Sequence, residues 1–326
     1  LDYFDPFDLA QNWDAIERSL DIFEGNSERY IFGAEAIPRY IPNHGPGVMA
    51  AILGIDPKFQ SRTAWFRREP YASVEEIVAL LEEERLDEGN PWYERLYRIT
   101  EVAAKRSEED YCVAMPDLGG VLDVLASFLG PTQMILTMKR NPEIIHESRA
   151  IILEKMMKVY DNLQSLIERH GDGCSSWMNI WCPDRWYPVQ CDFSAFLNPR
   201  WFKTFALPDI RSQADQLDHA IYHLDGPDAL VHLDEILQID SIDGVQWVPG
   251  AGRELKCSEV WMPIYKKIQE AGKSVVIDFF ELPERVSHFY EVLEPKLLHF
   301  TLVFTDRLRA KYYLPEFVGG ASGKGS

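Results

Sequence analysis

Short apolar runs that end in polar residues and lead into a helical pattern recur along the chain. The run AIYHLDG over residues 220–226 ends in His223 and Asp225, and a helical pattern follows. Two other runs lead directly into Asp117 and Asp192 in the same way. Because α/β barrels build their active sites at the carboxyl ends of the strands, each of these strands is predicted to deliver a carboxylate to one rim.

Strand-like and helical patterns alternate regularly after residue 110. The predicted strands span 111–115, 133–137, 176–181, 189–192, 219–223, 243–247, 274–279 and 297–303, and an earlier strand spans 29–32. Repeated strand–helix units of this kind predict a parallel sheet covered by helices. A closed (β/α)8 TIM barrel is favoured. A doubly wound open sheet is the alternative, but no GxGxxG sequence follows any predicted strand.

The chain divides into three predicted regions. Residues 1–28 form an N-terminal helical extension, because apolar residues recur at helical spacing over 9–23. Residues 29–318 form the barrel. Residues 319–326, GGASGKGS, are predicted to be a disordered tail.

The composition excludes some partners. The 326 residues include 52 acidic and 33 basic side chains, which gives a net charge of -19. Nucleic acids and anionic membranes attract basic surfaces, so neither is an expected partner. No apolar run approaches the roughly 18 residues of a membrane-spanning helix. The five cysteines are scattered and include no CxxC pair, which indicates reduced thiols and a cytoplasmic protein.

Three segments resemble the uroporphyrinogen decarboxylase superfamily. They are MPDLGGVLDVL from Met115, VQCDFSAFLNPRWFKTFALP from Val189, and HLDG from His223 with the later IDGVQW. This superfamily also contains methyltransferases that move methyl groups between corrinoid proteins and thiols. The resemblance covers about residues 110–250. It implies a uroporphyrinogen decarboxylase-like barrel in which Asp117 matches the aspartate at the centre of the cleft.

The sequence departs from both branches of this superfamily. The decarboxylases have an arginine-rich loop that grips the substrate. The corresponding segment here is residues 38–47, and its only arginine is Arg39. An acidic protein without an arginine clamp is a poor host for a polycarboxylate. The methyltransferase branch has a zinc site of the form His-x-Cys with a later cysteine. Here that pattern becomes His223-x-Asp225, and no cysteine follows Cys257.

The candidate catalytic residues are Asp117, Asp192 and Asp225. Each aspartate could instead cap the helix that follows it, which is the ordinary role of such a residue. His223 and Asp225 lie two positions apart on one strand, so both side chains share a face and could bind a divalent metal such as zinc. Asp278 and Glu281 are possible further ligands.

The candidate substrate-binding residues are largely aromatic. Trp177, Trp181 and Trp247 fall at predicted strand ends and loops, where they could form a wall for a flat or methylated cationic substrate. A place in the core is the alternative for each of them. Tyr222 adjoins His223, and His44 lies in a loop rich in glycine and proline of the kind that often carries function.

The predicted function is methyl transfer between a corrinoid protein, or a methylated small molecule, and an acceptor. The expected cofactors are a divalent metal and a corrinoid carried by a partner protein. The expected partners are that corrinoid protein and a small-molecule substrate. A metal-independent decarboxylase or lyase of the same superfamily is one alternative. A ligand-binding barrel without catalytic activity is the other.

Overall fold

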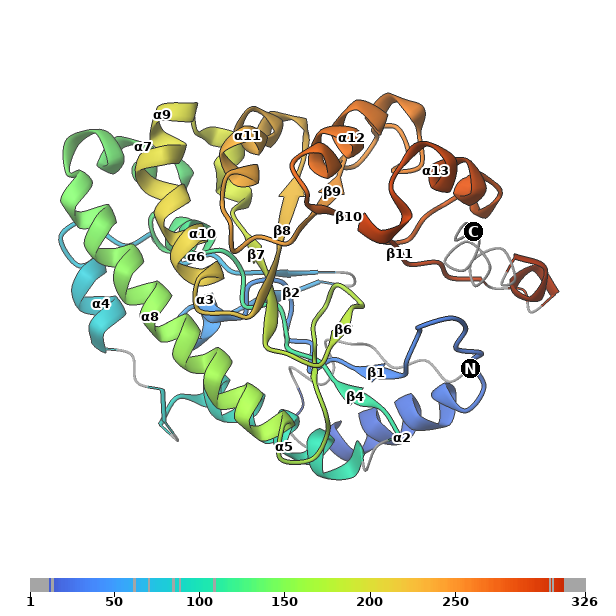
Figure 1. Ribbon diagram of the computed structural model, residues 1–326. Coiled ribbons are helices and arrows are strands. Elements are labelled where there is room, and N and C mark those ends of the chain that lie inside the picture. The colour runs from blue at the N-terminus through green and yellow to red at the C-terminus, as the bar shows by residue number, and fades with distance from the viewer. Residues whose placement is uncertain are drawn as a thin grey trace.

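The computed structural model describes most of the chain. The described residues are 12, 15–60, 63–69, 71–83, 86–87, 89–107, 110–304, 306 and 308–313. The predicted tail over 319–326 and most of the first 14 residues therefore lie outside the described residues. The mixture of helices and parallel strands makes this an α/β protein (Figure 1).

A five-stranded parallel sheet occupies the second half of the chain. Its strand order is β11-β10-β9-β8-β7, so neighbours in space are also neighbours in sequence. The strands are β7 (Trp186–Gln190), β8 (His219–Asp225), β9 (Gly244–Val248), β10 (Ser274–Ile277) and β11 (Leu298–Phe300). Since consecutive parallel strands need a crossover, the intervening helices lie beside the sheet and leave the carboxyl ends of all five strands at one edge.

The first half of the chain adds shorter strands. The parallel pair β1 (Arg39–Tyr40) and β4 (Cys112–Val113) is followed by a parallel bridge between Met115 and Ser176. The antiparallel pairs are β5 (Cys174–Ser175) with β6 (Trp181–Cys182), and β2 (Lys58–Phe59) with β3 (Ala64–Trp65). Among the described residues, no strand pairing closes these groups into one eight-stranded ring.

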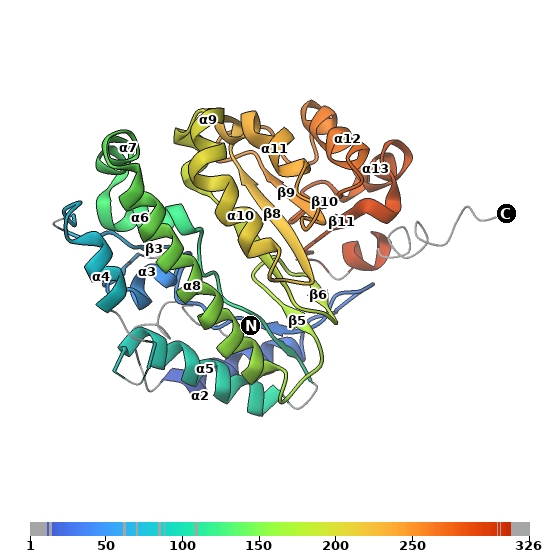
Figure 2. The same ribbon diagram turned by 60° about the vertical axis from the view of Figure 1, so that its left-hand side comes forward.

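Helices surround the strands on two sides (Figure 2). Around the N-terminal strands are α2 (Ile16–Ser27), α3 (Met49–Ile52), α4 (Ile77–Glu83), α5 (Pro91–Ser107), α6 (Val121–Leu129), α7 (Pro131–Arg140) and α8 (Pro142–Ile167). Beside the five-stranded sheet are α9 (Pro199–Trp201), α10 (Leu207–Ala214), α11 (Leu233–Leu237), α12 (Met262–Glu270) and α13 (Val286–Val292). One large apolar cluster runs through both halves, so the two sets of elements share a core.

Short 3-10 and π segments complete the connections. They are η2 (Asp192–Phe196), η3 (Phe202–Ala206), η4 (Pro227–His232), η5 (Glu259–Trp261), η6 (Pro283–Arg285) and η7 (Pro295–Leu297). Segments η2 and η4 follow β7 and β8 directly, at the edge where the candidate carboxylates were predicted.

Three strand predictions are wrong. Residues 133–137 belong to α7, where Met134, Thr137 and Met138 are buried at helical spacing. The 176–181 segment contains a turn between β5 and β6. Residues 29–32 form no strand and their apolar side chains are exposed, because the first parallel partner of β4 lies at Arg39–Tyr40 instead.

Among the described residues, no single helix is long and apolar enough to cross a membrane. Helices α6 and α7 together reach the length and apolar content of a membrane-spanning helix, but they are bent by 104° where they meet.

Candidate functional site

A row of polar side chains crosses three neighbouring strands near their carboxyl ends. In the strand register Gln190 of β7 pairs with His223 of β8, and His223 pairs with Gln246 of β9. Residues at equivalent register positions point to the same face of a sheet, so the three side chains form one row. This face is the one opposite the apolar residues Tyr222 and Leu224, which enter the core.

His223 is the central residue of this row. Its Nδ1 lies 2.5 Å from the Gln246 side-chain oxygen. An amide oxygen can only accept a hydrogen bond, so Nδ1 carries the proton and Nε2 keeps its lone pair. That Nε2 lies 4.0 Å from the carboxylate of Asp192. The ligand atoms of Asp192, His223 and Asp225 all lie within 4.8 Å of one another.

The segment of Asp117 is positioned by backbone contacts from two directions. Its carbonyl accepts hydrogen bonds from the N–H groups of Gly47 and Val48, at 3.1 and 3.0 Å. The hydroxyl of Tyr187 on β7 accepts a hydrogen bond from the backbone N–H of Leu118, the residue after Asp117, at 2.7 Å. Gly119 has a φ of +86°, and a Cβ there would lie 2.8 Å from the Cα of Gly47. The close approach of the two loops therefore requires glycine at 119.

The carboxylate of Asp117 joins the polar row. One oxygen accepts hydrogen bonds from the N–H of Gly119 at 2.8 Å and from the side chain of Gln190 at 3.0 Å. Burial raises the pKa of Asp117 to about 6. The Gly119 hydrogen bond and the neighbouring His223 lower this pKa, and the Asp192 charge raises it. A carboxyl that titrates near neutrality can exchange protons at physiological pH.

Asp192 owes its position to Asp123 of α6. The two oxygens of Asp123 accept the backbone N–H groups of Asp192 at 3.0 Å and Phe193 at 2.6 Å. This contact fixes the start of η2 directly after β7. The Asp192 side chain remains 54% exposed. Partial loss of hydration raises its pKa, the neighbouring His223 lowers it, and the Asp225 charge raises it.

Asp117, Asp192, Asp225 and His223 therefore lie together, and Trp177 joins them. The Trp177 ring meets the His223 ring edge to face, with centroids 5.2 Å apart. This contact comes from the turn between β5 and β6, so the group draws on both halves of the fold.

Four other predicted residues lie elsewhere. His44 is buried against Trp92 of α5, with ring centroids 6.5 Å apart, and burial lowers its pKa to about 4. Trp181 donates its indole N–H to the carbonyl of Asp172. Tyr222 and Trp247 are fully buried on the core face of their strands. None of these contacts joins the four side chains to His223.

The other residues weighed from the sequence are engaged in local contacts. Asp278 forms an ion pair of 2.9 Å with Lys256. Glu281 accepts the backbone N–H groups of Lys256 and Cys257. Arg39 donates to the carbonyl of Ser176 at 2.9 Å, so it braces the β5–β6 turn.

Sequence reasoning missed Gln190, Gln246 and Asp123. A signal for the glutamines was present, because Gln190 is the polar last residue of the buried strand β7 and Gln246 is a polar residue inside the largely apolar strand β9. The role of Asp123 had no such signal, because a carboxylate in the first turn of a helix is ordinary.

Comparisons with known proteins bear on the fold. No family model matches the sequence, and no curated protein matches it. Among solved structures, a methyltransferase from Methanosarcina mazei superposes with a TM-score of 0.58 at 9% sequence identity. The match covers 87% of this chain and 79% of that chain. At this identity the likeness shows a shared fold.

Proposed function

We propose that this chain is a methyltransferase of the corrinoid-linked, uroporphyrinogen decarboxylase-like type. The observation that carries the proposal is the geometry of His223, oriented by Gln246 and facing two carboxylates at the carboxyl edge of a parallel sheet. The solved structure of similar fold, described as a methyltransferase, supports the same reaction class.

We further propose a closed (β/α)8 barrel. The strand segments β1, β4, β5, β7, β8, β9, β10 and β11 follow one another in the order of such a barrel. Closure of the barrel would need two further strand pairings, one between β5 and β7 and one between β11 and β1.

Asp192, His223 and Asp225 would hold a divalent metal. Two carboxylates and one imidazole suit zinc and several other divalent ions, and Gln246 supplies the outer hydrogen bond that orients a metal-bound histidine. When bound, the metal would supply Lewis acidity that lowers the pKa of an acceptor thiol or similar group.

The remaining side chains would serve the organic substrate. A nucleophile that accepts a methyl group must lose its proton, and Asp117, with a pKa of about 6, is a suitable acceptor for it. The carboxylates favour a neutral or cationic substrate. The methyl donor would be a corrinoid on a partner protein or a methylated small molecule.

The test combines metal analysis with a methyl-transfer assay. Purified protein should retain divalent metal and should transfer the methyl group of methylcobalamin to a thiol. His223→Ala should lose methyl transfer and the metal held by this group, which lowers the metal content, whereas the matched variant His288→Ala, at an exposed surface histidine paired with Glu259, should keep both. Metal content and activity that are both unchanged in His223→Ala would refute the proposal.

A decarboxylase or lyase is the second candidate, and the partly buried carboxyl of Asp117, with its raised pKa, is the observation that favours it. Asp117 would stabilise a cationic intermediate without any metal. This candidate predicts activity that survives chelation and His223→Ala but not Asp117→Asn. Uroporphyrinogen itself should not react, because Arg39 is engaged with Ser176 and no arginine clamp is formed by the residues discussed above.

A further inference from the structure

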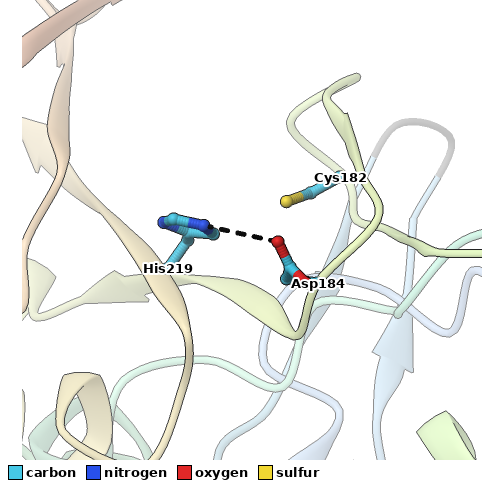
Figure 3. Close-up of side chains that lie close together, drawn as sticks. All are labelled: Cys182, Asp184 and His219. Carbon is cyan, nitrogen blue, oxygen red and sulfur yellow. Dashed lines mark ion pairs between the residues drawn. The ribbon is translucent and has the colours of Figure 1, made fainter.

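A second group of potential metal ligands lies at the other end of β8. It consists of Cys182 on β6, Asp184 in the turn before β7, and His219 at the first position of β8. Their ligand atoms lie within 4.8 Å of one another. Figure 3 shows the sulfur of Cys182 and the carboxylate of Asp184 directed toward the His219 ring.

The ring of His219 is oriented by a further carboxylate. Its Nδ1 lies 3.3 Å from an oxygen of Asp243, and its Nε2 lies 3.8 Å from Asp184. The same Asp243 oxygen accepts the backbone N–H of Ala220 at 3.0 Å, which fixes its position. A carboxylate that accepts the Nδ1 proton leaves the Nε2 lone pair free, as is usual for metal-binding histidines.

The electrostatic surroundings favour a cation at this place. Burial raises the pKa of the Cys182 thiol, and the charges of Asp184, Asp218 and Asp243 raise it further. Arg185 lies in the same turn, but its guanidinium pairs with Asp161 at 2.5 Å. A divalent ion would offset the carboxylate charges and would stabilise the thiolate.

We propose that Cys182, Asp184 and His219 bind a zinc ion through one thiolate, one imidazole nitrogen and one carboxylate oxygen. Water would complete the tetrahedral coordination. The ion would join the β5–β6 hairpin to the start of β8. The seven residues of β8 place His219 about 20 Å from Asp225. The site is therefore separate from the candidate catalytic group and does not depend on the proposed function.

The test uses cobalt as a spectroscopic probe. Chelator-treated full-length protein, kept reduced and without oxygen, should bind Co2+ with a thiolate-to-cobalt charge-transfer absorption that Zn2+ abolishes. The His223 group has no sulfur ligand and cannot produce this absorption. Cys182→Ser should remove it, and the matched variant Cys112→Ser, at a half-buried cysteine of β4, should keep it. Asp243→Asn should weaken Co2+ affinity about 10- to 100-fold.

A stability measurement checks the result in a second way. Added Zn2+ should raise the Tm of the chelator-treated wild type and of His223→Ala, because the ion binds only the folded site. It should leave the Tm of the double variant His219→Ala/His223→Ala unchanged. Cobalt binding without the charge-transfer absorption, or an absorption that persists in Cys182→Ser, would overturn the proposal. An equal Zn2+ effect in His223→Ala and in the double variant His219→Ala/His223→Ala would also overturn it.

Discussion

Asp117→Asn should stabilise the folded chain at neutral pH while impairing its activity. The folded pKa of Asp117 is about 6, against an ordinary value of 3.8. Between these values the unfolded chain binds fewer protons than the folded chain, so stability falls as pH rises through this window. A difference of about two pKa units corresponds to about 3 kcal/mol at 1.36 kcal/mol per unit.

The asparagine variant is free of this loss. Its side-chain oxygen can still accept the hydrogen bonds from Gly119 and Gln190. We expect the variant to match the wild type within about 1 kcal/mol at pH 4 and to exceed it by about 2–3 kcal/mol at pH 7–8. A variant that gains stability at pH 7 but loses activity would show that Asp117 serves function at a cost in stability.

Urea unfolding of both proteins from pH 4 to pH 8 measures this difference. Asp228→Asn is the matched control, because it makes the same replacement at an aspartate that is exposed at the start of η4. The reasoning is refuted if Asp117→Asn is less stable than the wild type at pH 8. It is also refuted if the difference between the two proteins does not change between pH 4 and pH 7.

Three further substitutions test the supports of the candidate site. Gly119→Ala should cost at least about 2 kcal/mol in urea unfolding, because its positive φ and the 2.8 Å approach to Gly47 leave no room for a Cβ. Asp123→Ala should cost about 2–3 kcal/mol by the same measurement, since two backbone N–H groups lose their acceptor. Gln246→Leu should lower metal affinity or methyl transfer about 10- to 100-fold, with Gln246→Glu closer to the wild type, and unchanged values in the leucine variant would contradict the orienting role.

Several parts of the fold follow from local pattern. The apolar runs before Asp117, Asp192 and Asp225 correspond to β4 with its bridge, β7 and β8, within a few residues of the predicted bounds. The long amphipathic segment after residue 142 is α8. The misassigned 133–137 segment is apolar enough for either structure, and its burial at helical spacing against α6 and α8 decided for a helix.

The sequence by itself determined that carboxylates and His223 follow apolar strands, because residue type and local periodicity are properties of the chain. Only the tertiary structure decided which of these groups meet. Gln246 is 23 residues from His223, and Asp123 is 69 residues from Asp192. Those contacts depend on the register of parallel strands and on how the crossover helices pack, and no local pattern specifies either. The same long-range packing placed Tyr222 and Trp247 in the core and brought Cys182 to His219.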